Sequence, residues 1–388
     1  GIEPVSIADY MRFLFDWQGL LEKRDGLESL AAVLQQLEGY SAAAGAWESD
    51  ILPARIDLYT QDMLETLCVT GRFSWLRLHT TASQTASKQK NPPVRLTPIS
   101  IVQRHHLLEW KVFSKTVSEQ SLSSAAHRVL NLLNARGALF FSDLVIQSGL
   151  LKTQLETVLG ELVSWGLLSS DGFAGLRALI TPNNKRPRLT GRRVKSMQSS
   201  PFDRAGRWAL IVPLDEDGNT IDAAESIPES DALETIAHTL LLRYGVVFRR
   251  VLEREIGLPP WRDLLRVYWR MEARGEIRGG RFVNGVSGEQ FAFQDAIGSL
   301  RNIRRKEKQG DLVTISACDP LNLTGTLLPG PKIAINNNCK IVFRDGVAIA
   351  AQSKQEIEFL CELDEQTRWD AGLLLSHNGK FRNLSRSH

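Results

Sequence analysis

The sequence has few cysteines and no long apolar run, and each lack excludes a class of protein. Its four cysteines, Cys68, Cys318, Cys339 and Cys361, lie far apart, with no C-x-x-C pair and no histidine at metal-ligand spacing. We therefore expect reduced thiols in a cytosolic protein, and neither a disulfide framework nor a metal site. No stretch approaches the roughly 18 uninterrupted apolar residues of a membrane helix, and no signal-like segment opens the chain. We expect no membrane partner.

Motifs for the common catalytic sites are also missing. The chain has no G-x-x-x-x-G-K-[ST] loop and no helicase-type acidic Mg²⁺ motif, so by itself it should neither bind nor hydrolyse ATP. It has no G-x-S-x-G elbow and no H-E-x-x-H helix. Asp319 is a candidate catalytic acid, but an Asp-Pro pair followed by Asn322 is more typical of a turn than of a catalytic site. We assign no catalytic residue, no metal ligand and no cofactor to this chain.

Composition bounds the size and the charge of the protein. With 388 residues, 43% of them hydrophobic, the chain can bury the cores of two or three domains. Lys and Arg total 47 against 44 Asp and Glu, so the distribution of charge, and not its sum, must indicate partners. The chain begins at Gly1 and enters a helical pattern at once, which suggests an excised fragment, although a processed N-terminus would look the same.

Hydrophobic periodicity predicts an α+β protein of tandem winged helices with a small C-terminal β-barrel or curled sheet. Three short helices followed by a hairpin, the winged-helix order, occur twice, and residues 61–78 resemble half of such a domain. The expected segments are 1–79, helical with half a winged helix; 80–121, linker and loop; 122–182, winged helix; 183–228, basic arm and strand; 229–306, winged helix with an arginine-rich recognition helix; and 307–388, barrel-like.

The sharpest local signal lies in the helix predicted at 259–274. Arg262, Arg266, Arg270 and Arg274 recur every four residues and so share one side, while Arg278 and Arg281 extend the charge into the wing. Arginines at this spacing on a recognition helix can meet successive phosphates of DNA. The alternative is an ordinary solvated face, with Glu272 and Glu276 as partners.

A second basic segment covers residues 183–207, where eight cations face a lone Asp203. A segment of this charge predicts nucleic-acid binding that weakens steeply with salt, while the alternative is a solvated linker. The cations that we predict to contact DNA here are Lys185, Arg186, Arg188, Arg192 and Arg193.

Two tryptophans near arginines are candidates for stacking on unpaired bases. Trp47 follows Gly45 in a predicted connection, and Trp75 lies on a predicted strand. Arg55 is near Trp47 in sequence and is predicted to contact DNA beside it. Burial in a core is the alternative for both tryptophans.

Several separate segments together resemble the Lhr (large helicase-related) family of superfamily 2 DNA helicases, in the part that follows the motor. The resemblance covers most of the chain, and its segments occur in the family's order. They are Trp47-Glu48-Ser49-Asp50-Ile51-Leu52-Pro53-Ala54-Arg55, Phe202-Asp203-Arg204-Ala205-Gly206-Arg207-Trp208, Arg243-Tyr244-Gly245-Val246-Val247-Phe248, Pro260-Trp261-Arg262, Arg274-Gly275-Glu276-Ile277-Arg278-Gly279-Gly280-Arg281-Phe282, Gly285-Val286-Ser287-Gly288-Glu289-Gln290-Phe291-Ala292 and Asp319-Pro320-Leu321-Asn322-Leu323.

The resemblance implies a function in DNA repair as the accessory part of an ATP-dependent helicase. Tandem winged helices and a β-barrel would grip the tracked single strand and help couple ATP hydrolysis to 3′-to-5′ unwinding. The implied partners are single-stranded or tailed duplex DNA and the RecA-like lobes of the same polypeptide, which would bind ATP and Mg²⁺.

Two other classes of function remain open. The predicted architecture is also similar to bacterial winged-helix DNA glycosylases, which would excise uracil or an alkylated base, but their Gln-x-Gln or Gln-x-Asp motif has no convincing match here. An oligomerisation scaffold is the third possibility.

Overall fold

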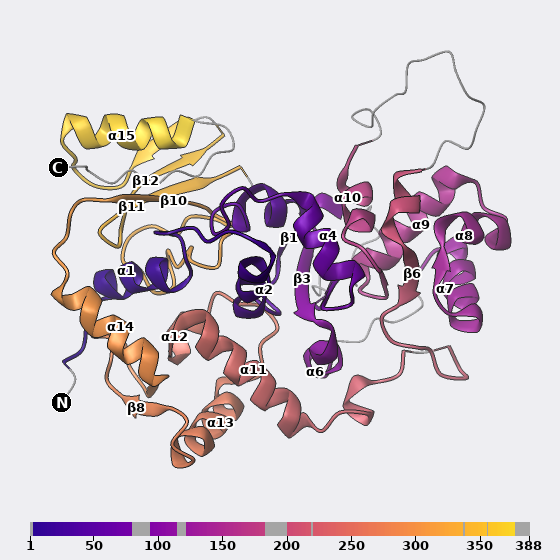
Figure 1. Cartoon of the computed structure of the whole chain (residues 1–388), viewed down its shortest axis with the longest axis horizontal. Helices are drawn as coiled ribbons and strands as arrows, with labels where there is room; N and C mark the ends of the chain where they lie inside the picture. Colours follow the sequence, from indigo (N-terminus) through magenta and orange to yellow (C-terminus); the bar gives the residue numbers. More distant parts are fainter. Residues whose placement is uncertain are drawn as a thin grey trace. The chain divides into compact units, whose positions relative to one another are not determined.

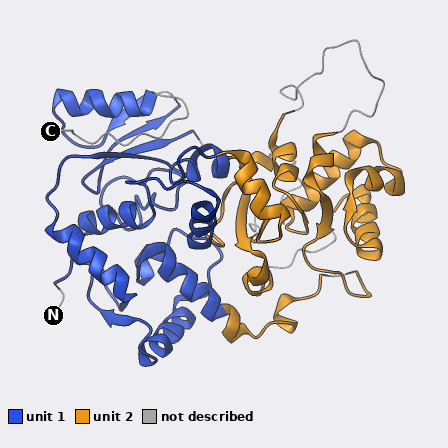
Figure 2. Ribbon diagram, in the orientation of Figure 1, with its two compact units in different colours: residues 1–37, 46–59, 233–388 blue, residues 38–45, 60–232 orange. Residues whose placement is uncertain are grey.

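The computed structural model describes residues 3–79, 94–114, 122–182, 200–218, 220–336, 338–354 and 356–376. They form two compact units (Figure 2). Unit 1 comprises Gly1–Leu37, Ala46–Tyr59 and Leu233–His388, and unit 2 comprises Glu38–Gly45 and Thr60–Ala232. Each unit is therefore built from segments far apart in the sequence.

A winged helix forms the first half of the segment of unit 1 that begins at Leu233, and its first helix starts four residues earlier, at Glu229. Its first three helices and a three-stranded antiparallel sheet, in the order β7-β9-β8, follow the predicted pattern, and a fourth helix comes after the sheet. Inside it, the Tyr268 ring stacks on Phe291 with centroids 5.4 Å apart, and its hydroxyl donates to the carbonyl of Ala237. The elements are α11 (Glu229–Tyr244), β7 (Val246–Val247), α12 (Arg249–Leu252), α13 (Trp261–Ala273), β8 (Arg278–Gly280), β9 (Gln290–Ala292) and α14 (Gln294–Arg305).

The second helix of this winged helix is shorter than its sequence predicts. The pattern at 246–256 predicts one helix, but the structure has the strand β7 and then the four-residue α12. Val246 and Val247 pair with Ala292 and Phe291 of β9. Because β-branched residues favour strands over helices, these two residues belong to the sheet and not to the predicted helix.

The C-terminal sheet of unit 1 is open. Its four antiparallel strands lie in the order β10-β11-β12-β13, with β10 and β13 at the edges. Helix α15 lies across one face (Figure 1), where Ala371, Leu374 and Leu375 pack on Val342 and Ile349. The elements are β10 (Leu312–Ser316), β11 (Lys340–Arg344), β12 (Val347–Ser353), β13 (Glu356–Phe359) and α15 (Glu365–Ser376).

The prediction of a barrel or curled sheet is therefore wrong, and a helix that the sequence analysis missed explains why. Alternate side chains point to opposite faces of a sheet, so Phe343 lies opposite the face that Val342 turns to α15. There Phe15 of α1 (Ile7–Trp17) meets Phe343 edge-on, with centroids 5.1 Å apart. Helices on both faces bury the sheet without closure. The predicted strand at 332–335 is irregular.

Helix α1 joins the winged helix to this sheet. Its buried Tyr10 donates from the hydroxyl to the carbonyls of Tyr244 and Val246, at 3.0 and 2.9 Å. The side chain of Ser6 accepts from the backbone N–H of Asp9 and caps the helix. The other helical segments of unit 1 are α2 (Leu27–Gln36), α3 (Ala44–Ala46), of which Ala46 belongs here, and the π-helical turn η1 (Trp47–Ile51).

Unit 2 holds two further three-stranded sheets, ordered β1-β3-β2 and β4-β6-β5. The second sheet takes β4 and β5 from the range 122–182, where we predict a winged helix, but its middle strand β6 lies beyond that range. β3 and α6 lie within 80–121, where the sequence analysis predicts linker and loop. The elements are β1 (Ala42–Ala43), α4 (Gln61–Val69), β2 (Phe73–Leu76), β3 (Pro98–Gln103), α6 (Leu107–Lys111), α7 (Ser124–Arg136), β4 (Leu139–Phe140), α8 (Phe141–Ser148), α9 (Lys152–Ser164), β5 (Leu168–Ser170), α10 (Ala174–Ile180) and β6 (Arg207–Leu210).

Candidate nucleic-acid interface

The outward face of α13 carries the arginine stripe that the sequence predicts. Pro260 occupies the N-cap position and fixes where the helix starts. The inward face holds four buried residues, Leu264, Val267, Tyr268 and Met271. Because these fill one side, Arg262, Arg266 and Arg270 lie exposed on the other.

Most of these cations are not neutralised. Arg266, Arg270, Arg278 and Arg281 make no ion pair or side-chain hydrogen bond with the residues that the structure describes. Arg262 is 81% exposed and lies 3.8 Å from Asp263, which is a weak pair. Glu272 and Glu276 therefore do not pair with the centre of the stripe, and contact of these arginines with DNA stays a prediction.

Arg274 differs from the others because it is bound at the helix end. Its guanidinium lies 2.6 Å from Glu234 and 2.6 Å from Glu276. The hydrogen bond between Arg274 and Glu276 raises the pKa of the arginine and lowers the pKa of the carboxyl. Arg274 is thus paired with two carboxylates at the end of α13 while it stays exposed, and its contact with DNA stays a prediction.

A tryptophan that the sequence analysis missed lies among these arginines. The side chain of Trp269 is 46% exposed, although large aromatic residues are usually buried. Its indole N–H donates to the Glu289 carboxylate at 2.6 Å, so the ring is held in place on the surface. Residue 269 lies three positions after Arg266, and this helical spacing was the signal that could have found it.

The wing continues the same surface. The backbone N–H of Gly279 in β8 donates to the carboxylate of Glu272 at 3.0 Å, which holds the wing against the end of α13. Arg278 and Arg281 flank this contact and are exposed. The contact between Trp269 and Glu289 holds the far end of the wing to the same helix. Helix and wing therefore form one cationic surface with an exposed aromatic ring.

The predicted basic arm cannot be placed beside this surface. Lys185, Arg186, Arg188, Arg192 and Arg193 lie outside the described residues, and their contact with DNA stays a prediction.

Both tryptophans predicted to stack on bases are core residues, which corrects that prediction. The side chains of Trp47 and Trp75 are completely buried. Trp75 packs edge-on against Phe173 and Trp208, and its indole N–H donates to the carbonyl of Gly172. It holds together the two sheets of unit 2, and neither ring has a free face for a base.

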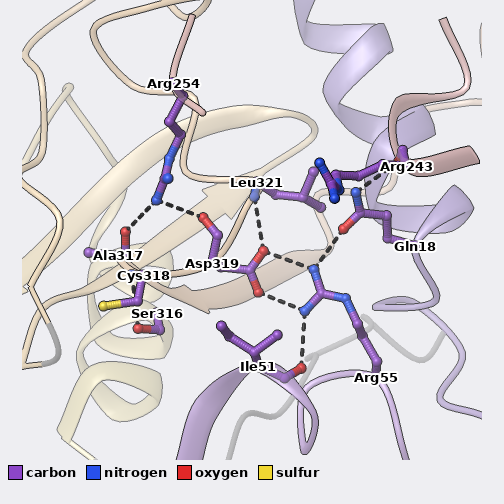
Figure 3. A network of polar contacts seen from close by, with 10 residues as sticks. All are labelled: Gln18, Ile51, Arg55, Arg243, Arg254, Ser316, Ala317, Cys318, Asp319 and Leu321. Carbon is purple, nitrogen blue, oxygen red and sulfur yellow. Dashed lines mark hydrogen bonds and ion pairs between the residues drawn. The ribbon is translucent and has the colours of Figure 1, made fainter. Parts of the chain in front are cut away.

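Arg55 is also a core residue, and its predicted contact with DNA is wrong for the same reason. Its buried guanidinium makes a bidentate ion pair with the Asp319 carboxylate, with N–O distances of 2.7 and 2.9 Å (Figure 3). It also donates to the side chain of Gln18 and to the carbonyl of Ile51. Asp319 is thus neither free acid nor catalytic base but the partner of a buried cation.

The ion pair belongs to a wider network in unit 1 (Figure 3). Gln18 donates to the carbonyl of Arg243 at 2.9 Å, and Arg254 donates to the carbonyls of Ala317 and Asp319, both at 3.0 Å. The backbone N–H of Leu321 donates to the Asp319 carboxylate, as the predicted turn requires. The network thereby joins α1, the segment after η1, α11 and the turn after β10.

Burial shifts the pKa values of two titratable groups near this network. Burial raises the pKa of Asp50 to about 6, against the opposing effect of its hydrogen bond with Ser49. Burial also raises the pKa of the Cys318 thiol to about 11, which keeps it protonated and unreactive at neutral pH.

The described residues hold no group of three or more His, Cys, Asp or Glu side chains able to bind a metal ion. The four cysteines are free, and only Cys361 is exposed. Within the described ranges, no helix has the length and apolarity required to cross a membrane.

Two family models match the chain, and both describe a winged-helix domain of large helicase-related protein. The model of the third such domain matches residues 5–99, and the model of the fourth matches residues 226–312. The second match contains α13 and its wing.

Two curated proteins are similar to most of the chain. The Lhr helicase/uracil glycosylase of Escherichia coli (strain K12) is 29% identical over 372 residues, which covers 84% of this chain and 22% of that protein. The Lhr helicase/probable uracil glycosylase of Mycolicibacterium smegmatis is 28% identical over 352 residues, covering 85% of this chain and 22% of that protein. The chain therefore spans about a fifth of the length of the relatives it matches.

The buried ion pair makes a direct prediction about stability. Asp319→Asn keeps the size of the side chain but leaves the Arg55 charge buried without a counter-ion, so the free energy of unfolding should fall by about 3–5 kcal/mol. Urea unfolding followed by tryptophan fluorescence measures this change. Glu276→Gln, which alters an exposed pair with Arg274, is the control and should leave the free energy of unfolding nearly unchanged. A loss in Asp319→Asn as small as that in the control would show that the buried pair is dispensable.

Proposed function

Because this chain is homologous to the large helicase-related (Lhr) proteins over most of its length and carries two of their winged-helix domains, we propose that it is the DNA-binding part of an Lhr-type helicase. The observation that carries the proposal is the row of unpaired arginines on α13 and the wing. An exposed cation without a counter-ion retains its full charge for a phosphate.

The geometry favours the sugar-phosphate backbone as the primary contact. Arg266 and Arg270 lie one helical turn apart, and Arg278 and Arg281 add charge from the wing. Cations in a row bind phosphates in any sequence, so we expect affinity with little base preference.

The exposed ring of Trp269 favours a single strand over a closed duplex. A base can stack on an aromatic face only when it is not already stacked between its neighbours. We propose that α13 and the wing hold the tracked single strand or the unpaired tail of a duplex, with Trp269 against one base.

ATP-driven unwinding of DNA would then require a motor that is separate from the surface of α13 and the wing. The sequence has no phosphate-binding loop for ATP, so its residues do not fit ATP and Mg²⁺. We propose that the RecA-like lobes of the longer polypeptide bind them, and that the grip on the strand couples hydrolysis to 3′-to-5′ unwinding in DNA repair.

The arginine row predicts the salt dependence of binding. Arg266→Ala combined with Arg270→Ala should weaken binding to a single-stranded oligonucleotide at least about tenfold, since each charge-assisted hydrogen bond is worth roughly 1.5–3 kcal/mol. The slope of log affinity against log salt should flatten by about 1.4, because each lost phosphate contact removes roughly 0.7. Fluorescence polarisation over a salt series measures both.

The control for this experiment removes the same charge elsewhere. Arg136→Ala combined with Lys152→Ala changes two exposed cations of the winged helix in unit 2, where α9 uses Glu161 to bind Ser123 and has no arginine row. The control should bind as the unmodified chain does. If both double variants lose affinity equally, net charge and not the α13 surface explains binding.

The exposed ring predicts strand preference. Trp269→Ala should weaken single-strand binding roughly 5- to 150-fold, since stacking is worth about 1–3 kcal/mol per base, and should leave binding to a blunt duplex nearly unchanged. Trp369→Ala, on α15, removes a tryptophan that is 66% exposed and is the matched control. An equal effect on single strand and duplex would contradict base stacking.

A second candidate function is removal of uracil from DNA, and the observation that favours it is that the names of both relatives include uracil glycosylase. On this hypothesis the chain alone should create an abasic site in a uracil-containing single strand without ATP. Alkaline cleavage of an end-labelled oligonucleotide measures the product. An intact strand after prolonged incubation would eliminate excision and leave binding unaffected.

A further inference from the structure

A second cationic site lies on the winged helix of unit 1, away from the face of α13. A cavity of about 540 Å³ is bounded by residues of α14, by Phe282 after the wing strand β8 and by the first described residues of the chain. Its polar rim is formed by Arg301, Arg304, Arg305 and Glu3. This volume falls in the range typical of small-molecule sites.

The wall opposite α14 is held in place by the backbone. Val5 forms a parallel bridge with Val283, in which the N–H of Val5 donates to the carbonyl of Phe282 and the N–H of Asn284 donates to the carbonyl of Val5, both at 2.8 Å. The cavity is therefore built between a fixed strand segment and a helix.

The charge of the rim is unbalanced. Arg301 and Arg305 are exposed and have no ion pair or side-chain hydrogen bond with the described residues, while Arg304 pairs with the carboxylate of Glu3. Three arginines and one carboxylate leave a net charge of 3 − 1 = +2 around one cavity. Like charges three or four residues apart on a helix repel one another, so this arrangement is unfavourable without an anion.

Stabilisation of the helix end does not explain these arginines. Cations in the last turn of a helix often satisfy its free carbonyls, but Arg12 from α1 already fills this role. Its guanidinium donates to the carbonyls of Ile303, Lys306 and Glu307, at 3.4, 3.0 and 3.5 Å. Arg301 and Arg305 are therefore not needed to bind the carbonyls that Arg12 already reaches, and Arg304 is paired with Glu3.

We propose that this cavity binds a nucleoside monophosphate, either as a free nucleotide or as the phosphorylated end of a nucleic-acid strand. A phosphate monoester carries close to two negative charges at neutral pH, which matches the net charge of the rim, whereas a phosphodiester within a strand carries one. The buried residues Val5, Phe282 and Leu300 form the apolar floor of the same cavity, and its volume leaves room for a sugar and a base beyond the phosphate.

Glu3 acts in this site as an internal competitor. Its carboxylate occupies Arg304, so a phosphate has to displace it or share the guanidinium. Replacement of Glu3 by Gln removes one negative charge from the rim. If the cavity binds an anion, its affinity for that anion should increase after this change. If the ion pair is only structural, no ligand should bind more tightly.

The test is titration of the chain with adenosine 5′-monophosphate by isothermal calorimetry. We expect saturable binding that weakens at least tenfold in the double variant Arg301→Gln, Arg305→Gln and tightens about threefold or more in Glu3→Gln. Adenosine, which lacks the phosphate, should show no saturable binding. The double variant Arg136→Gln, Lys152→Gln in unit 2 is the matched control and should bind the nucleotide as the unmodified chain does. Circular dichroism melting establishes that each variant is folded.

Competition then identifies the source of the phosphate. Displacement of the nucleotide by a 5′-phosphorylated oligonucleotide, but not by its 5′-hydroxyl form, supports the strand end, and displacement by neither supports a free nucleotide. Absence of saturable nucleotide binding, equal binding of adenosine, or unchanged affinity in the Arg301 and Arg305 variant overturns the proposal. Strand binding through α13 is read from the polarisation assay, so failure of either site is distinguishable from failure of the other.

Discussion

The fold of unit 1 depends on one completely buried ion pair, between Arg55 and Asp319. A lone buried charge is expensive to desolvate, so each partner requires the other in place. Gln18 and the carbonyl of Ile51 satisfy further donors of the guanidinium. The pair thereby determines how the segment after η1 meets the turn after β10, and α1 then connects this centre to the winged helix and to the open sheet.

Arginine has two physical roles in this molecule, and the counter-ion distinguishes them. Arg55 and Arg243 are buried and form ion pairs with Asp319 and Glu255. Their charge is therefore neutralised within the fold. Arg266 and Arg270 are exposed and unpaired among the described residues, so their charge is available to a polyanion. The buried network connects the winged helix to α1 and to the turn after β10, while α13 of the same winged helix presents the second group at its surface.

Local patterns predicted what depends on local sequence. The winged-helix order and the exposed side of α13 follow from helical periodicity and from Pro260, and both are confirmed. The fates of Arg55 and Trp75 depend on partners distant in the chain, since Asp319 is 264 residues from Arg55 and Gly172 is 97 residues from Trp75. The prediction of a barrel was wrong because α15, which the sequence pattern did not predict, covers one face of the sheet. Exposure of Trp269 was not predicted because large aromatic side chains are usually buried.

Cross-linking of bound DNA to the protein tests the central claim most directly, because it reports position and not affinity alone. A single-stranded oligonucleotide that carries 5-iodouracil, irradiated in complex with the chain and mapped by mass spectrometry, should attach to peptides of α13 and of residues 278–289, with Trp269 the principal site. Attachment confined to α15 or to unit 2, with none on α13, would contradict the account.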